Sequence, residues 1–402
     1  MNILQETLES ESIKYLKTKL ISRKIQEEGY SLTDDQLAAI EEQIANASDS
    51  VLTIEIPGYE DVDIQINVEE VDVTRALDEY TEKLSNEMPK IIQNTSEVVL
   101  ANLKSRVPEM LAERAEIRNK FEESVLQKWG KALELLEMFI VIAAEAGDDF
   151  NEEFRSTASQ ESDFVFDVLT RLHARACQIA NEILTLLKSG YADGAYARWR
   201  TMHEIAVVGL FVHKFGQDVA ERYLLHDVVE SHRAAQQYQR NCTRLGYEPL
   251  TDRELSQVES SYQGLVNRFG RSYANSYGWA AHALDKRDPK LSDIEQVVDL
   301  EHWRSHYKLA SHNVHANPKG MFHQLGIYPG SRELLLVGPS DTGYTDPGHS
   351  TAISLLQITT FLLTLRPNID RLSVCHILST LTEEIGNTFL SIQQRQEEAP
   401  QP

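Results

Sequence analysis

The pattern of hydrophobic and polar positions predicts a chain made mostly of helices. Between residues 161 and 190, apolar residues recur every three or four positions, which is typical of a helix with one buried face. That face is expected to hold Phe164, Val168, Leu172, Ala176, Ile179, Ile183 and Leu187. A turn between Gly190 and Gly194 then leads into a second helix that packs as its antiparallel neighbour and points Trp199 and Phe211 inward.

The remainder of the second half continues in the same pattern. Helices are predicted over residues 219–245 and 252–272, a histidine-rich helix is predicted from about residue 294, and two more follow the Gly/Pro-rich stretch PSDTGYTDPGHS. A hairpin formed by FHQLGIY and ELLLVGP is expected to interrupt them. We therefore predict a helical bundle domain over residues 161–402.

The pattern of apolar residues in the first half predicts a different organisation. Two helical stretches are followed by alternating apolar residues in VLTIEIP and DVDIQINV, with Pro57 and Gly58 between them, and this alternation predicts a β-hairpin over residues 51–68. We expect an acidic α+β region over residues 1–95. Connecting helices and the polar stretch GDDFNEEFRSTASQES, interpreted as a surface linker, are predicted for residues 96–160.

Charge distinguishes the two halves. The net charge is −23, and residues 1–160 contain 34 acidic against 16 basic residues, which leaves 28 against 23 for the rest. The first half is therefore at −18 and the second at −5. A polyanion would be repelled at long range by the first half, and a basic protein partner would be attracted to it.

Other bulk features place the chain among ordinary globular proteins. It has 402 residues, 42% of them hydrophobic, and its longest apolar runs are too short to span a bilayer, so a cytoplasmic protein without membrane contact is expected. The cysteines, Cys177, Cys242 and Cys375, lack the paired spacing of a zinc or redox motif. No GxSxG, GxxxxGK[ST] or GxGxxG motif occurs, and no cofactor is expected.

The candidate chemistry lies in the second half, because all 13 histidines follow residue 160. On the expected histidine-rich helix, four polar side chains fall within about one quadrant at 100° per residue. They are Arg304, Lys308, Ser311 and His315. A histidine beside a cation suits RNA cleavage without a metal, in which the imidazole moves a proton and the cation stabilises charge on the phosphorane. A solvated helix face would present the same pattern.

A second constellation is the pair Arg200 and Glu204, four residues apart and in line with Val207 and Phe211. Charges in line with apolar residues are expected to be half-buried. Because burying a charge is costly unless it is paired, the pair is expected either to lock two helices together or to position a polar group in a cleft.

These motifs resemble a known group of proteins. The run G-x3-G-A-x4-R-T-M-H-E from Gly190 to Glu204, then YGW at Tyr277–Trp279, then Y-x3-S-x3-H-x-N-P from Tyr307 to Pro318 is similar to an uncharacterised bacterial family. That family is all-helical, has a domain-of-unknown-function label, occurs among phage-defence genes and distantly resembles the HEPN nucleases and toxins. The resemblance covers about residues 160–345.

The resemblance implies a HEPN-like helical bundle and a homodimeric, toxin-like ribonuclease of antiviral defence. HEPN ribonucleases carry an Arg, four to six residues and then a His. Here seven residues separate Arg304 from His312, and the better spaced pair, Lys308 and His315, has lysine in place of arginine. By resemblance, Arg200, Glu204, Ser311 and His315 are the polar residues of the family's functional site, with Lys308 or Arg304 as the phosphate-facing cation and His315 as the acid/base group.

Two other classes of function stay open. A non-catalytic sensor or assembly module would use the acidic first half to bind a protein partner. An HD-type phosphohydrolase would bind a metal through His226 and Asp227, with His203 and Asp299 as further ligands. The helical pair His302 and His306 could also take zinc, although no third ligand follows at regular spacing.

Overall fold

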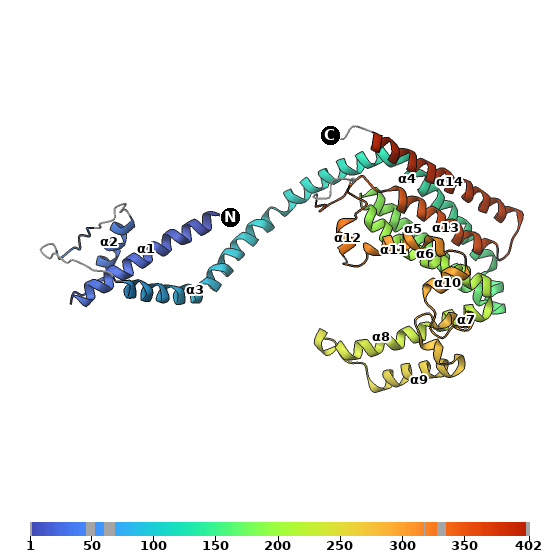
Figure 1. Cartoon of the computed structure of the whole chain (residues 1–402), viewed down its shortest axis with the longest axis horizontal. Helices are drawn as coiled ribbons and strands as arrows, with labels where there is room; N and C mark the ends of the chain where they lie inside the picture. The colour runs from blue at the N-terminus through green and yellow to red at the C-terminus, as the bar shows by residue number, and fades with distance from the viewer. Residues whose placement is uncertain (1, 46–52, 60–68, 317, 328–334, 399–402) are drawn as a thin grey trace. The chain divides into compact units, whose positions relative to one another are not determined.

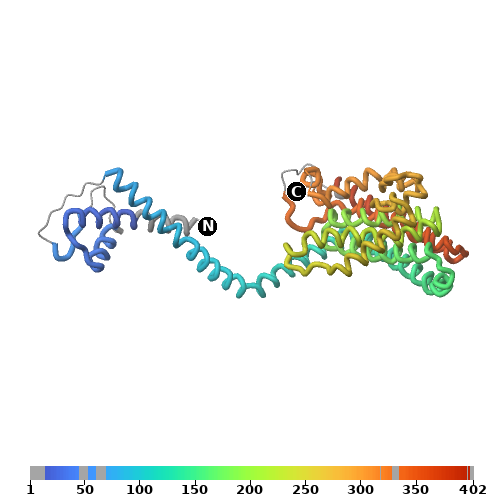
Figure 2. Tube along the Cα trace, turned by 90° about the horizontal axis from the view of Figure 1, so that it is seen from below, coloured from blue at the N-terminus to red at the C-terminus, as the bar shows by residue number. Residues whose placement is uncertain are grey.

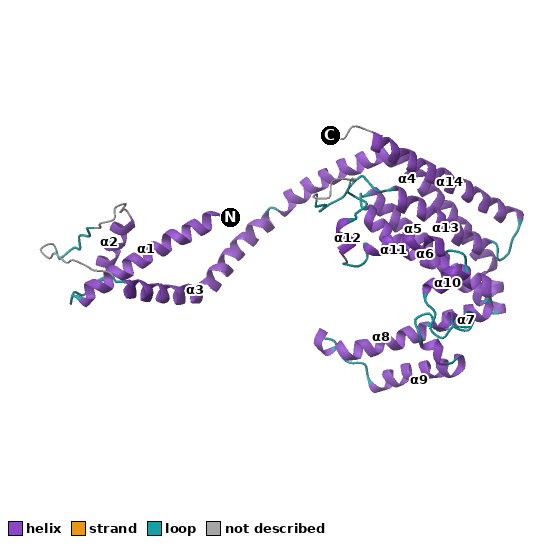
Figure 3. Cartoon of the chain, viewed as in Figure 1, coloured by secondary structure: helices purple, strands orange, loops and turns teal. Residues whose placement is uncertain are grey.

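A computed structural model describes residues 2–45, 53–59, 69–316, 318–327 and 335–398, and every regular element within these ranges is a helix (Figures 1 and 3). The predicted mainly α fold class is thereby confirmed. The chain forms two compact units, Met1–Arg114 and Ala115–Pro402. The long helix α4 (Val107–Glu161) begins in the first unit and continues in the second.

The first unit contains α1 (Asn2–Glu27), α2 (Asp34–Ala45) and α3 (Glu70–Ser105). Its small core consists of Ile25 from α1 with Ile40 and Ile44 from α2. A capping box fixes the start of α3, and the N-terminal Asp72 of that helix pairs with Lys24 at 2.7 Å. This unit therefore has a hydrophobic core of its own.

The hairpin expected over residues 51–68 is not present in the described residues of that range. Residues 53–56 form no strand, and residues 51–52 and 60–68 lie outside the described part of the chain. The backbone of Glu55 bonds instead to the side chain of Gln43, with Nε2 to its carbonyl at 2.7 Å and its amide to Oε1 at 2.8 Å. A glutamine of α2 thus satisfies the groups that a second strand was expected to pair.

The second unit is built from the remainder of α4 and from helices that follow in chain order. These are α5 (Phe164–Lys188), α6 (Ala192–Phe215), α7 (Gln217–Leu225), α8 (Asp227–Asn241), η1 (Thr243–Leu245), α9 (Asp252–Phe269), η2 (Arg271–Ala274), η3 (Gly278–Ala280), α10 (Leu291–Val297), η4 (Glu301–Trp303), α11 (Arg304–His312), α12 (Pro318–Phe322), α13 (Thr345–Leu363) and α14 (Ile369–Glu398).

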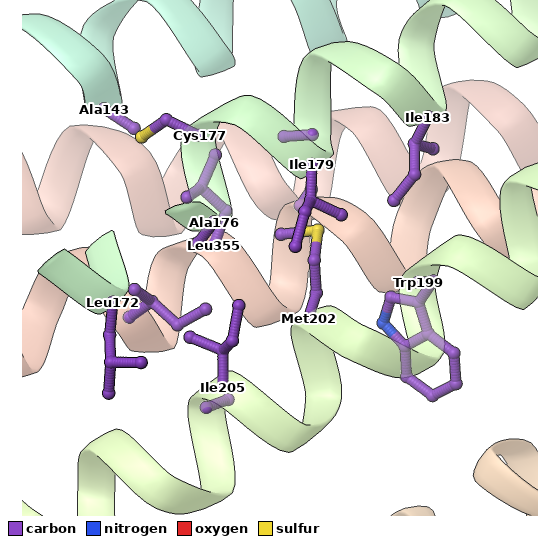
Figure 4. Packing of buried hydrophobic residues seen from close by; sticks show 14 of the residues in the cluster. Ala143, Leu172, Ala176, Cys177, Ile179, Ile183, Trp199, Met202, Ile205 and Leu355 are labelled. Carbon is purple, nitrogen blue, oxygen red and sulfur yellow. The ribbon is translucent and has the colours of Figure 1, made fainter. Parts of the chain in front are cut away.

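The core of this unit lies where α5, α6 and α13 pack together (Figures 1 and 2). Figure 4 shows Ile179 of α5 meeting Met202 of α6, with Leu355 of α13 nearby, and all three are fully buried. Of the seven residues expected on the buried face of α5, all but Phe164 are buried. Between α5 and α6, Gly190 adopts a φ of +86° and turns the chain back as predicted.

The polar stretch expected as a linker is helical. The helix α4 continues to Glu161, because Phe150, Phe154 and Ala158 recur four residues apart within the acidic sequence and face the core. The chain turns only at Ser162, whose φ is +54°. The prediction of a linker was therefore wrong, and α4 is part of the bundle.

The histidine-rich helix is interrupted. It consists of α10, a turn in which Asp299 has a φ of +57°, η4 and α11. For the second expected hairpin, residues 322–327 and 335–339 form no strand and residues 328–334 lie outside the described residues. These breaks direct α11 back along α6, where the candidate site lies.

One core histidine makes stability depend on pH. Burial lowers the pKa of His173 from 6.5 to about 4, and its Nε2 lies 3.1 Å from the Thr359 hydroxyl. Above pH 6.5 the ring is neutral in both states. As the pH falls from 6.5 toward 4, only the unfolded chain takes up the proton, so stability is lost. We expect this residue to account for a loss of about 2 kcal/mol between pH 8 and pH 5.

Urea unfolding at both pH values measures this loss in the wild type and in His173→Gln. The glutamine variant should lose less stability on acidification by that amount, even if it is less stable at pH 8. The same acid sensitivity in both proteins would assign the effect to other groups, such as His213, His226 and His349, whose pKa values burial also lowers.

Candidate functional site: the polar centre between α6 and α11

The helix α11 lies antiparallel to α6. Near the start of α11, Tyr307 donates a hydrogen bond to Glu204, and just after its end Asn313 donates to Asp193, eleven residues earlier on α6. Tyr307 and Ala310 of α11 are buried, and α11 packs against α6. This packing places the polar residues of the two helices side by side.

Arg200, Glu204 and Tyr307 form one network. The Tyr307 hydroxyl donates to Glu204 Oε1 at 2.5 Å, and Arg200 Nη2 lies 3.2 Å from the same oxygen. The Arg200 guanidinium also lies over the Tyr307 ring, 4.8 Å from its centroid. The Arg200 and Glu204 side chains are 26% and 34% exposed, so the predicted ion pair is half-buried.

The surroundings of this network shift the pKa values of its side chains. Burial and then the bond to Glu204 raise the pKa of the Tyr307 hydroxyl well above its usual range, so it stays a donor at neutral pH. Burial opposes the charge on Arg200, but Tyr307, Glu204 and Tyr277 together raise the pKa of its guanidinium. Burial raises the pKa of Tyr277, and Glu204 adds to this shift.

A second network lies beside the first. Glu295 of α10 is completely buried and accepts a bond from Arg304 Nη1 at 2.7 Å, while its other oxygen lies 3.1 Å from Nε2 of the buried His203. The Arg304 guanidinium lies 5.3 Å from the centroid of the Tyr307 ring. Both arginines therefore border one tyrosine, and the two networks together constitute the polar centre: Arg200, His203, Glu204, Glu295, Arg304 and Tyr307.

The polar centre retains groups that could contact a ligand. Glu204 Oε1 has both of the contacts described above, whereas Oε2 has no partner among the described residues and is not buried. Within the same residues, Arg200 Nε is the single buried side-chain nitrogen or oxygen without a hydrogen bond. The centre thus offers an acceptor beside two half-exposed guanidinium groups, an arrangement suited to an anion that also carries a hydroxyl.

The structure places the remaining predicted site residues outside this centre. The Ser311 hydroxyl donates to the Tyr307 carbonyl at 2.7 Å. Lys308 and His315 are exposed, and neither side chain has a partner among the described residues. Because Asn313 bonds to Asp193, seven residues before Arg200 on α6, His315 lies about 10 Å along the helix from the polar centre. The structure therefore brings together Arg200, Glu204 and Arg304, but not His315.

Asp193 was not predicted and fixes the segment after α11. Its Oδ1 accepts from the Leu325 amide at 2.8 Å and from the Asn313 side chain at 3.2 Å, and its Oδ2 accepts from the Gly326 amide at 3.1 Å. The sequence marked this position only by the predicted turn between Gly190 and Gly194. One carboxylate thus accepts three hydrogen bonds from the segment that follows α11.

The two metal sites considered from the sequence do not form. His226 is buried, with Nε2 within 3.1 Å of the Tyr273 and Asn275 carbonyls, so this nitrogen donates a proton and cannot ligate a metal. His203 contacts Glu295, whereas Asp227 and Asp299 are exposed. His306 contacts the Tyr196 hydroxyl at 3.0 Å. The residues that the structure describes contain no group of three or more His, Cys, Asp or Glu side chains arranged to hold a metal.

Comparison with known proteins shows that the polar centre lies within a segment that matches a protein family. Residues 166–329 match a family of unknown function, DUF5677, and every residue of the polar centre lies inside this range. The match supports the predicted uncharacterised domain, and the HEPN resemblance stays a prediction. No curated protein and no solved structure matches the chain significantly. Among the described helices, none is both long and apolar enough to cross a membrane.

Proposed function

We propose that this protein is a metal-independent endoribonuclease of HEPN-like character, a toxin-like effector of antiviral defence that acts as a homodimer. The observation that carries the proposal is the pair Lys308 and His315. Both side chains are exposed and free of partners in the described part of the chain. They lie seven residues apart, and the His315 amide still bonds to the Ser311 carbonyl at 3.3 Å, so the helical geometry that aligns them extends to His315.

The chemistry follows from these two side chains. The His315 imidazole accepts the proton of an RNA 2′-hydroxyl, the 2′-oxygen forms its bond to phosphorus, and the bond to the 5′-oxygen breaks. The leaving oxygen takes up the proton from the imidazolium or from water. Lys308 stabilises the charge on the phosphorane, since Arg304 is already bonded to Glu295. Arg200 and Glu204 hold α11 in place through Tyr307 and bind a neighbouring part of the strand.

The test is cleavage of total RNA in EDTA by the full chain. His315→Ala is expected to lose at least about a hundredfold in rate, in the usual range for an acid/base group, and Lys308→Ala to lose less. His302→Ala is the matched control, because His302 is exposed and lies outside the quadrant that contains Lys308 and His315, and its rate should not change. Equal cleavage by wild type and His315→Ala, or none by wild type on RNA from both uninfected and phage-infected cells, would refute the proposal.

The second candidate is a non-catalytic assembly module whose acidic part binds a basic protein. One observation favours it: residues 1–114 form a unit with its own core and contain 24 acidic against 11 basic residues, a net charge of −13. Deleting residues 1–114 should abolish capture of a basic partner. A deletion to residue 160 would be uninformative, because α4 supplies core residues from Val125 onward. Undiminished capture by the shorter chain would exclude this candidate.

A further inference from the structure

The end of α3 and the start of α4 form a helical stretch that is exposed in the described part of the chain. Every residue from 89 to 114 is exposed. The break between the helices at Arg106 is slight, because the Arg106 amide bonds back to Asn102 and its carbonyl accepts from the Met110 amide at 3.0 Å. Helices in water gain most of their stability by burying an apolar face, so a partner that covers an apolar face of this stretch would stabilise it.

The same stretch carries unburied apolar side chains. Nine large ones are between 37% and 70% exposed, namely Ile91, Ile92, Val98, Val99, Leu100, Leu103, Val107, Met110 and Leu111. At about 100° per residue they lie on more than one face of the helix. Four of them lie on one face, called the seam, at heptad spacing, namely Ile92, Val99, Leu103 and Met110, and the two intervening positions of that face are Ser96 and Arg106.

Charge identifies the partner that this seam suits. Residues 87–114 contain four Lys and Arg and four Glu, so the segment is neutral, whereas residues 1–86 contain 20 acidic against 7 basic residues. A basic protein would be drawn to residues 1–86 and not to the seam. Two copies of the neutral segment do not repel each other, and both carry charges of each sign beside the seam.

We propose that residues 91–111 pair with the same residues of a second copy of this chain, with Ile92, Val99, Leu103 and Met110 buried between the two helices. This surface would supply the homodimer included in the proposed function, but it does not depend on RNA cleavage. Its test measures molar mass without RNA, so either proposal can fail while the other stands.

The test compares two doubly substituted full-length chains by light scattering at about 50 µM. Wild type should have twice the 45.6 kDa mass of one chain. Leu103→Glu with Met110→Glu places two charges in the seam and should give the single-chain mass. The matched control is Ala101→Glu with Ala112→Glu, which adds two charges to exposed positions on the opposite face and should stay dimeric.

Circular dichroism and the thermal transition show that the variants fold. The buried core of the second unit begins at Val125, so its transition should be the same in all three proteins. A wild type of 45.6 kDa, including one that binds a different protein, would overturn the proposal. A seam variant that stays dimeric, or a control variant that dissociates equally, would also overturn it.

Discussion

Replacing Arg304 by alanine is expected to lower the free energy of unfolding by about 3 kcal/mol or more, in the range found when one partner of a buried ion pair is removed. Glu295 is 0% exposed, and without Arg304 the one side-chain contact left to its carboxylate among the described residues would be with His203. The folded state would then contain a buried carboxylate without its ion-pair partner. Urea unfolding at pH 7 measures the loss.

The chain offers a close control for burial. Lys188 and Glu137 lie at the same 2.7 Å, and Lys188 is 37% exposed compared with 36% for Arg304, but Glu137 is 49% exposed. Lys188→Ala should therefore cost less than about 1 kcal/mol. In a double-mutant cycle, Arg304→Ala with Glu295→Gln should cost less than the sum of the single changes, because the buried charge is absent. Strict additivity would mean that the two groups are not coupled.

Gly209→Ala is expected to destabilise the protein by about 2 kcal/mol, although alanine favours helices. A Cβ at Gly209 in α6 would lie 2.2 Å from the buried Phe361 ring of α13, so the ring or one of the two helices would have to shift. Overpacking of this kind costs about 1 to 3 kcal/mol or more and outweighs the gain of about 1 kcal/mol in helix propensity.

Gly130→Ala is the matched substitution, and its expected effect on the free energy of unfolding has the opposite sign. Gly130 is also buried within a helix, α4, but no atom lies within 4 Å of its ideal Cβ. We expect it to raise the free energy of unfolding by about 1 kcal/mol, because only the propensity changes. Thermal or urea unfolding of both variants checks the pair. A gain in stability at Gly209 would show that α6 and α13 can separate at little cost.

The helices could be predicted where apolar spacing is regular, as in α5. The error at the end of α4 came from treating Gly147 and the following acidic residues as breakers. In the structure Gly147 allows His173 to approach, because a Cβ there would lie 2.2 Å from the His173 ring, and the helix continues past it. A single sequence does not distinguish a glycine that ends a helix from one that admits a neighbouring side chain.

The candidate site was predictable in part. The four-residue spacing of Arg200 and Glu204 predicted their pairing, which the structure contains. Tyr307 lies on the buried face of α11, but the partner of its hydroxyl depends on how α11 packs against α6. Glu295 had no signal at all, because one acidic residue among 62 gives no indication of complete burial. The burial of Glu295 and the partner of Tyr307 depend on how segments far apart in the sequence pack together.

The attachment of Asp193 has a consequence for proteolysis. Residues 314–316 are exposed, while the chain before them is held by the packing of α11 and the chain after them by the Asp193 carboxylate and by the bond from Thr342 to the Leu325 carbonyl. A protease that cuts in this exposed stretch would leave two fragments fastened together. The nicked protein would elute as an intact molecule and separate into its pieces only in denaturant.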